Sequence, residues 1–499
     1  MDIQAISGNL AEIEADALLV YLIEGGQLVN NGKAVDDALK GAISEVIEGG
    51  DFTAKSGETL VIYTRGAIPA KRVIVVGLGE EDKITLEIVR RTAASGLQKA
   101  RDLKLKHVAG GAVGVNSGRF ETAESAQAMT EGALLGLYQY HGQKSSVTPE
   151  DVPEKFDLVT VNVDAASTGI ATGKAFAVGT SLTRKLINLP PNILTPAYLA
   201  EQAEAMSKEV GLSIKILEKA QMQALKMGAL LGVAQGSDYP PHFIVMEHNA
   251  DKKNELDTVV LVGKGVTFDT GGYSLKTSVG MTSMKADMSG GAAVIGAMRT
   301  IAELNPNVHV VGLVPAADNM VSGNAYRPQE VLTASNGKTI EIISTDAEGR
   351  LLLADALVYA QRYNPAAVVD IATLTGSMII ALGHTTTGFY SNDDAISAKL
   401  SNAGDTTNEF VWRLPMYEEY SEALKSDTAD TKNSGGAAGR AGGAGVAAHF
   451  LSHFVDYNWA HIDMAGMIDN DGKNPYQPKH SAKGYGSRLL TEFVRQWVE

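Results

Sequence analysis

The sequence predicts an α/β protein built from two α/β domains, a smaller N-terminal one and a C-terminal one whose mixed sheet is sandwiched by helices. Runs of apolar and β-branched residues alternate with stretches of helical periodicity, which is the pattern of layered α/β folds. The alternation is interrupted by Pro190 and Pro191 and then resumes. A length of 499 residues, 44% of them hydrophobic and 20% charged, also fits more than one globular domain.

The N-terminal part alternates between the two patterns from its start. Strands are predicted at 16–22, 59–64, 72–79 and 158–163, and helices at 85–103 and 121–140. The polar, proline-bearing segment 143–157 is typical of a loop, and a helix at 173–189 is ended by the proline pair. We therefore divide the chain into an N-terminal domain at 1–165, a connecting helix at 166–190 and a second domain at 191–499.

The C-terminal part contains apolar runs that are almost continuous, as in strands that are covered on both faces. Strands are predicted at 258–265, 308–316, 339–344 and 366–374, and helices at 290–304, 350–363 and 445–455. Their alternation predicts a mixed or parallel sheet between two layers of helices.

Composition excludes several classes of function. The chain has no cysteine, so disulfides, Cys-based zinc sites and thiol nucleophiles are ruled out. The net charge of −15 argues against nucleic acid as the main partner. We expect no signal peptide, because no basic segment followed by an apolar core opens the chain, and no membrane span, because no apolar run is long enough. The expected location is the cytoplasm.

Charged residues collect at two places where a predicted strand ends, and ligands of open α/β sheets bind at such ends. They are Lys264, Asp269, Lys276 and Asp287 in the glycine-rich segment 263–291, and Asp346, Glu348 and Arg350 after the strand at 339–344. If that second segment is extended, Asp346 and Glu348 face the same way because they are two residues apart. Four carboxylates in one cleft repel one another unless hard divalent cations neutralise them. Two such ions about 3.5–4 Å apart form a recurring hydrolytic site.

Other interpretations of the same residues stay open on this reasoning alone. Asp287 precedes one predicted helix, and Asp346 and Glu348 precede another, so each acid could simply stabilise a helix N-terminus. A two-metal carboxylate site would also suit phosphoester hydrolysis.

Three further motifs are poor candidates for chemistry. His449 and His453 are four residues apart on a predicted helix, but Phe450 stands where a zincin motif needs glutamate, so packing or surface roles are favoured. Phe268 replaces the third glycine of a dinucleotide-binding pattern. The glycine-rich segment 433–445 lacks the Gly-Lys-Ser/Thr end of a phosphate-binding loop, and we interpret it as a flexible loop beside the active site or at an interface.

The motifs GKGVTFDTGG…MKADMSGGAAV and TDAEGRLLLADAL resemble the two core motifs of the leucine (cytosol) aminopeptidase family, and the protein resembles its bacterial-type two-metal members. Segments at 182–196, 370–376, 439–451, 459–466 and 483–490 are similar to later family segments in the same order. The resemblance is close over roughly 180–499, while the first 165 residues match only in pattern.

The resemblance implies a metal-dependent exopeptidase that releases N-terminal residues, by means of a water that bridges two metals. It implies two divalent ions per subunit, zinc or manganese, with magnesium or cobalt also accepted. One ion would be held by Lys264, Asp269, Asp287 and Glu348, and the other by Asp269, Asp346 and Glu348. Lys264 must be neutral to bind a metal, and a nearby dication lowers the pKa of an ammonium group enough to allow this.

The same resemblance assigns roles to the remaining charges. One metal and Asp287 would hold the α-amino group of the substrate, Lys276 would stabilise the oxyanion, and Arg350 would hold a bicarbonate ion as general base. The substrate-binding positions of the family fall on Met284, Thr373, Gly376 and Ala465. Their mostly apolar, uncharged character predicts a preference for leucine- or methionine-like residues.

The resemblance also implies a homohexamer, built as a dimer of trimers, and a regulatory or oligomerisation role for residues 1–165. Some bacterial members also act as accessory transcription or recombination proteins, but the acidic N-terminal part argues against DNA binding here. Ser344 replaces the usual asparagine before TDAEGR, and a hydrogen bond that positions the loop is expected to be lost without a change of reaction. The native metals and the physiological peptides are not predicted by the sequence.

Overall fold

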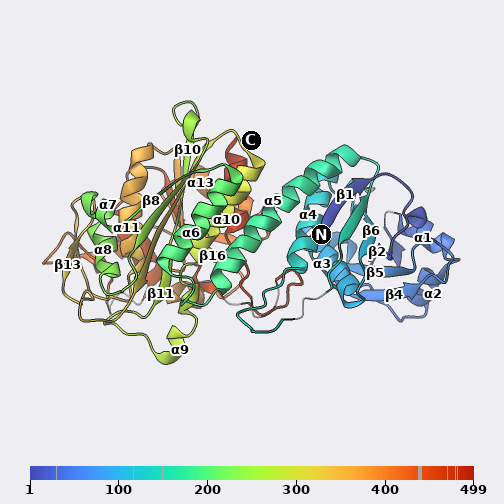
Figure 1. Ribbon diagram of the computed structural model, residues 1–499, viewed down its shortest axis with the longest axis horizontal. Coiled ribbons are helices and arrows are strands. Elements are labelled where there is room, and N and C mark those ends of the chain that lie inside the picture. Colours follow the sequence, from blue (N-terminus) through green and yellow to red (C-terminus); the bar gives the residue numbers. More distant parts are fainter. Residues whose placement is uncertain are drawn as a thin grey trace. The chain divides into compact units, whose positions relative to one another are not determined.

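The computed structural model (Figure 1) describes residues 1–29, 31–115, 117–147, 151–436, 441–468, 470–477, 479 and 481–498. Its contacts divide the chain into two compact units, one of Met1–Ala177 with Asp471–Ser481 and one of Val178–Asn470 with Ala482–Glu499. The division falls inside helix α5 (Val163–Asn188). No helix in the described part of the chain is long and apolar enough to cross a membrane.

The first unit contains a seven-stranded sheet between helices. Its order is β1-β7-β6-β2-β5-β4, with β3 paired to β2. The elements are β1 (Asp2–Ile6), β2 (Ala17–Ile23), β3 (Gln27–Leu28), α1 (Gly32–Ala38), α2 (Ala42–Glu48), β4 (Thr59–Tyr63), β5 (Arg72–Gly79), α3 (Leu86–Asp102), β6 (His107–Gly111), α4 (Thr122–Gly136) and β7 (Lys155–Val159). Separate apolar clusters lie on the two faces, with α1 and α2 in one and α3 and α4 in the other. The predicted strand at 158–163 is displaced, because Asn162 accepts a hydrogen bond from Ala165 N and begins α5.

The second unit is built on a nine-stranded mixed sheet of order β17-β16-β19-β15-β10-β12-β9-β8, with β11 paired to β12. These strands are β8 (Ser213–Leu217), β9 (His242–His248), β10 (Thr258–Gly263), β11 (Gly265–Asp269), β12 (His309–Asn319), β15 (Ala367–Ala372), β16 (Thr387–Ser391), β17 (Val411–Arg413) and β19 (Trp459–Asp463). Strands β12, β10, β15 and β19 run parallel, whereas β9 and β16 pair antiparallel with β12 and β19. The mixed sheet predicted from the apolar runs is therefore confirmed.

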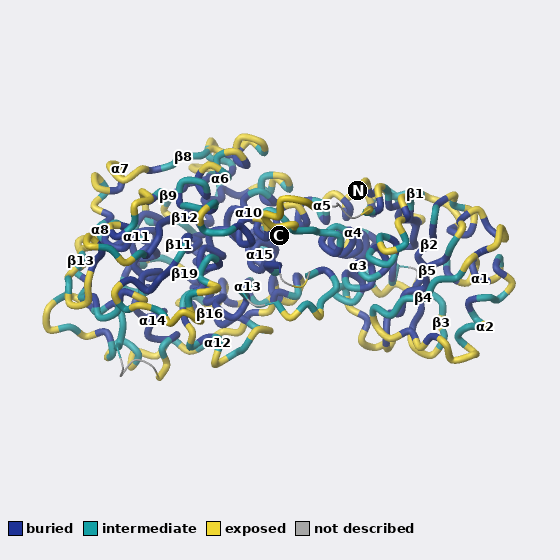
Figure 2. Tube along the Cα trace, turned by 60° about the horizontal axis from the view of Figure 1, so that its bottom comes forward, coloured by how far each residue is buried: buried dark blue, intermediate teal, exposed yellow. Residues whose placement is uncertain are grey.

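Helices cover both faces of this sheet (Figure 1). One apolar cluster contains α6 (Pro196–Val210), α10 (Ser289–Leu304), α13 (Asp394–Thr407) and α15 (Ser487–Val498), and the other contains α8 (Gly228–Ala234), α11 (Gly349–Ala360) and α14 (Gly443–Ser452). The shorter helices are α7 (Lys219–Ala224), α9 (Ser278–Met281) and α12 (Gly376–Leu382). Figure 2 shows the central strands buried, and all eleven residues of β12 are buried. This accounts for the almost continuous apolar runs in the sequence.

The predicted strand at 339–344 is not part of the large sheet. It forms only β14 (Thr339–Glu341), which pairs with β13 (Val331–Thr333) and β18 (Thr431–Lys432) in a separate three-stranded sheet. Only the central residue of β14 is buried, so the apolar residues of this segment do not indicate a strand covered on both faces.

Candidate functional site

The charged residues singled out in the sequence converge at the carboxyl ends of the central strands. Lys264 lies between β10 and β11, and Asp269 is the last residue of β11. Asp287 lies two residues before the start of α10, while Asp346 and Glu348 precede α11. The carboxyl ends of strands thus carry two of these five residues, and the segments that lead into two helices carry the other three.

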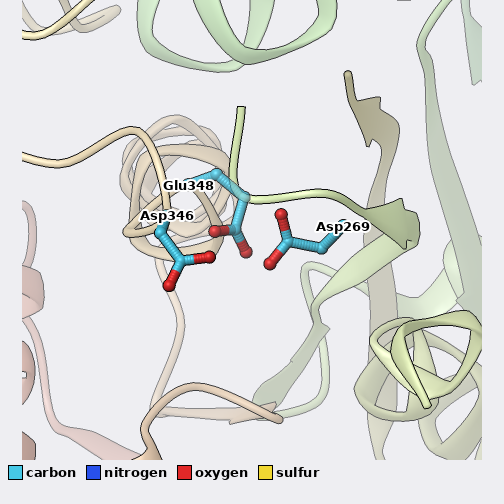
Figure 3. A group of neighbouring side chains, drawn as sticks. All are labelled: Asp269, Asp346 and Glu348. Atoms are coloured by element: carbon cyan, nitrogen blue, oxygen red, sulfur yellow. The ribbon is translucent and has the colours of Figure 1, made fainter. Parts of the chain in front are cut away.

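Three carboxylates form a compact group (Figure 3). Asp269, Asp346 and Glu348 each offer an oxygen, and these oxygens all lie within 4.8 Å of one another. The segment that carries Asp346 and Glu348 is not extended, because residues 345–346 form a turn and Glu348 is the N-cap of α11 with helical dihedral angles. The expected convergence of the two acids is correct, but a turn rather than strand alternation produces it.

Two lysines lie between the acids, the buried Lys264 and the half-buried Lys276. Lys264 Nζ is 2.8 Å from Asp287 Oδ1 and 2.8 Å from Glu348 Oε1, and it also donates to the main-chain oxygen of Thr373 at 2.9 Å. Lys276 Nζ is 2.7 Å from Asp269 Oδ2 and 2.6 Å from Asp346 Oδ1. All four carboxylates are therefore paired with one of two cations.

Burial and mutual repulsion perturb the ionisation of this cluster. Burial, assisted by the charge of Glu348, raises the pKa of Asp269 to about 6. Burial also raises the pKa of Asp346 and holds the pKa of Asp287 well above its usual range. Burial favours the neutral form of the Glu348 carboxyl. The two lysines favour its charged form more strongly, so the pKa of Glu348 is lowered. Such a set of opposed shifts within one cleft is typical of functional sites.

The donor set suits a hard divalent cation. Asp287 is 5% exposed, and its Oδ2 atom is buried without a hydrogen-bond partner. A buried carboxylate oxygen is costly to leave unsatisfied, and a metal ion would satisfy it. The four carboxylates also outnumber the two lysines that pair with them, so added positive charge would relieve their repulsion.

Arg350 lies beside this cluster in the first turn of α11 and is 7% exposed. Its Nη1 donates to the main-chain oxygen of Asn433 at 2.6 Å, while its Nε is buried without a partner. Burial lowers the pKa of Arg350 to about 10, so the guanidinium stays charged at neutral pH. A charged, partly unsatisfied guanidinium can bind a planar anion through parallel hydrogen bonds.

The four predicted substrate-binding positions come from three short segments. Met284 begins a turn of 3₁₀ helix at Met284–Ala286, Gly376 begins α12, and Ala465 begins a 3₁₀ turn at Ala465–Met467. The hydroxyl of Thr373 donates to Asp287 Oδ1 at 2.8 Å, so this residue supports a carboxylate of the cluster. A Cβ atom built at Gly376 meets nothing within 4 Å, so the space in front of this residue is open.

Asp463, which the sequence did not single out, joins two of these segments. Its Oδ1 accepts hydrogen bonds from the main-chain nitrogens of Leu374, Thr375 and Ala465, and its Oδ2 accepts one from the hydroxyl of Thr375. Asp463 is the last residue of β19, so an acid at the end of an apolar run is the signal that could have identified it.

A second group of polar residues supports the carboxylates from behind. Asn319, at the end of β12, donates to Asp269 Oδ1 at 2.7 Å and to the main-chain oxygen of Thr345 at 3.0 Å. Tyr326 donates to that same oxygen at 2.8 Å, and the hydroxyl of Thr345 donates to the main-chain oxygen of Gly271 at 2.6 Å. The loop after β11 and the loop before α11 are thus connected by uncharged side chains, and of these only Thr345 belongs to a motif quoted from the sequence.

The remaining candidates do not join the site. In the described part of the chain, the Asp269, Asp346 and Glu348 group is the acid or histidine cluster that could hold a metal, and it does not include His449 or His453. His449 is buried, and its ring lies 6.1 Å from that of Tyr420, which is a packing role. Residues 437–440 of the glycine-rich segment lie outside the described residues, so its predicted role as a flexible loop stays a prediction.

Comparison with known proteins follows the same division of the chain. Residues 181–491 match the model of the cytosol aminopeptidase family, catalytic domain, and residues 17–146 match that of its N-terminal domain. A protein named Probable cytosol aminopeptidase from Roseiflexus castenholzii is 46% identical over 470 residues, which cover 93% of this chain and 95% of that protein. The cytosol aminopeptidase of Pseudomonas aeruginosa is 41% identical over 492 residues, which cover 97% of each.

Solved structures are similar over nearly the whole chain. A mutant of tomato leucine aminopeptidase is 32% identical with a TM-score of 0.87, and the match covers 99% of this chain and 96% of that chain. The bottromycin maturation enzyme BotP in complex with Mn is 32% identical with a TM-score of 0.85, and the match covers 97% of this chain and 100% of that chain.

Proposed function

This chain belongs to the cytosol aminopeptidase family of metal-dependent hydrolases that release N-terminal residues, and we propose that it removes leucine- or methionine-like residues from peptides with two divalent metal ions. The observation that carries the metal count is the four-carboxylate cluster with its unpartnered Asp287 Oδ2 atom. The arrangement favours this activity over phosphoester hydrolysis, because lysines rather than an arginine cluster accompany the acids.

Lys264, Asp269, Asp287 and Glu348 would hold one ion, and Asp269, Asp346 and Glu348 the other. Two ions there would supply the charge that makes a bound water acidic near neutral pH. Zinc or manganese is proposed, with magnesium or cobalt as alternatives, and the complex of the similar protein BotP with Mn supports manganese as a candidate. Lys264 would bind a metal only after its Nζ atom loses its proton. When no cation is present, the surrounding carboxylates outweigh the effect of burial and raise the pKa of Lys264.

Lys276 and Arg350 would complete the chemistry. Burial opposes the charge of Lys276, but Asp269 and Glu348 outweigh it and raise the pKa of its ammonium group. A charged Nζ is suited to stabilise the oxyanion that develops on the scissile carbonyl. Arg350, with its unpartnered Nε, would hold bicarbonate, which would act as general base.

The substrate preference is proposed from the four positions Met284, Thr373, Gly376 and Ala465. None of them carries a charge, and the open space at Gly376 could receive an unbranched or γ-branched side chain. Asp287 lies next to Thr373 and could bind the free α-amino group of the peptide, which would restrict cleavage to the N-terminus.

The oligomeric state of the protein and its location in the cell are proposed from its relationship to the family. We expect a homohexamer built as a dimer of trimers, with residues 1–165 serving regulation or oligomerisation. The names of the relatives support a cytoplasmic location. Peptides are the expected partners, and we expect binding to neither membranes nor nucleic acid.

The direct test is hydrolysis of leucine p-nitroanilide before and after chelation, and then with Mn²⁺ or Zn²⁺ restored. We expect activity to vanish with the chelator and to return with the metal, and alanine and glutamate p-nitroanilides to be poorer substrates. Quantification of bound metal in the active protein should give two ions per chain. Absence of activity in every metallated state would contradict the proposal.

A further inference from the structure

Asn433 lies behind the acidic site and is 0% exposed. It directly follows β18, which pairs in parallel with β14, so it stands beside the segment that leads from β14 to Asp346. Its main-chain nitrogen continues the ladder by donating to the oxygen of Glu341 at 2.9 Å. From this point the two segments are joined by the Asn433 side chain instead of by strand pairing.

Both ends of the Asn433 amide are used on this one segment. Oδ1 accepts hydrogen bonds from the main-chain nitrogens of Ile343 at 2.8 Å and Ser344 at 3.3 Å. Nδ2 donates to the main-chain oxygens of Ser344 at 2.7 Å and Ala347 at 3.4 Å. An asparagine side chain has two donor hydrogens and two acceptor lone pairs, so its hydrogen-bonding capacity is full. These bonds enclose Asp346 on both sides, at residues 344 and 347.

The main chain of the same residue holds Arg350. The oxygen of Asn433 accepts the 2.6 Å hydrogen bond from Arg350 Nη1. One buried residue therefore contacts the backbone around Asp346 through its side chain and the guanidinium of Arg350 through its carbonyl. A small displacement of Asn433 would move both groups relative to Asp269.

We propose that Asn433 is a positioning residue that fixes Asp346 and Arg350 against the rest of the metal cluster, an inference that rests on the proposed two-metal function. It fixes the distance between Asp346 and Asp269, which comes from another segment of the chain. It also fixes the direction of the unpartnered edge of Arg350. The residue itself contacts neither substrate nor metal in this role.

Asn433→Asp tests the proposal with almost no change of volume. The substitution replaces the Nδ2 donor with an oxygen that repels the carbonyls of Ser344 and Ala347, so the loop must shift. We expect the affinity for Mn²⁺, measured by calorimetric titration of metal-depleted protein, to fall about 10- to 100-fold for the ion that uses Asp346. The added negative charge alone would attract a cation, so a weaker affinity would be due to geometry.

Activity gives an independent measurement. If Asn433 served only metal affinity, saturating Mn²⁺ would restore kcat fully. We expect kcat of the variant to stay about 10-fold or more below that of the wild type at saturating metal, because Arg350 is displaced as well. The matched control is Asn249→Asp, since Asn249 Nδ2 also donates to two main-chain oxygens, those of Pro306 and Val308, at the other end of β12. The control should lower thermal stability without changing Mn²⁺ affinity or kcat.

Unchanged Mn²⁺ affinity and kcat in a folded Asn433→Asp protein would overturn the proposal, as would equal losses in the Asn249→Asp control. If the Asn433→Asp protein does not fold, the same two measurements are made on Asn433→Ala. This substitution removes the four side-chain hydrogen bonds without adding charge. A wild-type protein that binds Mn²⁺ but hydrolyses no aminoacyl substrate would refute the proposed function and leave the titration comparison valid. A wild type that binds no divalent ion would refute both.

Discussion

Lys264 Nζ lies 2.8 Å from Glu348 Oε1, and their side chains are 3% and 2% exposed. The two residues come from the carboxyl end of β10 and the entrance of α11, so this ion pair joins the central sheet to the loop that carries Asp346. Asp287 Oδ1 lies at the same distance from the same nitrogen. In the absence of a divalent ion, Lys264 is the cation that holds these acids together.

Lys264→Met should therefore destabilise metal-depleted protein. Removal of one partner of a buried ion pair costs about 3–5 kcal/mol, because the remaining charges are left uncompensated. We expect a loss of about 3 kcal/mol in the free energy of unfolding by urea, and partial recovery with Mn²⁺, which neutralises the same acids. Lys285→Met is the control, because Lys285 donates to the main-chain oxygen of Asn188 and is paired with no acid of the cluster. Equal losses in the two variants would contradict this role.

Glu348→Gln and Arg350→Ala should separate two roles that lie two residues apart. Glu348 is proposed to contact both ions, so the loss of its charge should leave no measurable turnover and weaken metal binding. Arg350 is proposed to hold only the anion that acts as general base, so its removal should lower kcat about 10²-fold, as is typical of general acid–base groups, with metal content unchanged. The comparison requires kcat and bound metal for both proteins, and similar losses in both quantities would refute the assignment.

Gly376→Leu should change the choice of substrate. A side chain at this position extends into open space, where the first side chain of the peptide is proposed to lie. We expect kcat/KM for leucine p-nitroanilide to fall about 10-fold or more relative to alanine p-nitroanilide, the size typical of a few methylene groups in a pocket. Alanine p-nitroanilide serves as the internal control in the same protein. A proportional fall for both substrates would place Gly376 outside the pocket.

Ser344→Asn should have little effect, although the family usually has asparagine at this position. The hydroxyl of Ser344 accepts a hydrogen bond from Asp346 N at 3.3 Å, and an asparagine side chain can make the same local contact. Asn433 binds the main chain of residue 344 and is indifferent to its side chain. We expect kcat and Mn²⁺ affinity to change by less than about 3-fold, a change below 1 kcal/mol in binding free energy. A larger gain would mean that Ser344 limits the wild-type site.

The sequence could predict the large sheet and the charged cluster because both leave local signals. Buried strands such as β12 are nearly continuous apolar runs, and Asp269 stands out because it is one of several charges in the glycine-rich segment that follows such a run. Asn319 and Asn433 left no such signal, because each is a neutral amide whose partners lie more than 25 residues away in the chain. The small sheet of β13, β14 and β18 was missed for a related reason, since strands of two or three residues are too short to show a period.

The pH dependence of stability should contain a contribution from His461. This residue is fully buried between the rings of Trp459 and Tyr390, and its Nδ1 lies 2.5 Å from Asp370 Oδ1. Burial opposes the imidazolium, but the charge of Asp370 outweighs it, so the pKa of His461 is raised above its ordinary value. A raised pKa in the folded state stabilises the protein fully below about pH 6.5, the unfolded value, and this contribution is lost as the pH rises through the folded value.

The free energy of unfolding should therefore decrease as the pH rises above about 6.5, more steeply in the wild type than in His461→Gln. Glutamine keeps a donor that can reach Asp370 but does not titrate, so the variant should be less stable overall and its stability should depend less on pH. Urea unfolding at several pH values in that range measures both slopes, with metal content held constant to keep the acidic cluster from contributing. Parallel curves for the two proteins would show that His461 has the same pKa in the folded and unfolded states, and that its contact with Asp370 adds no pH-dependent stability.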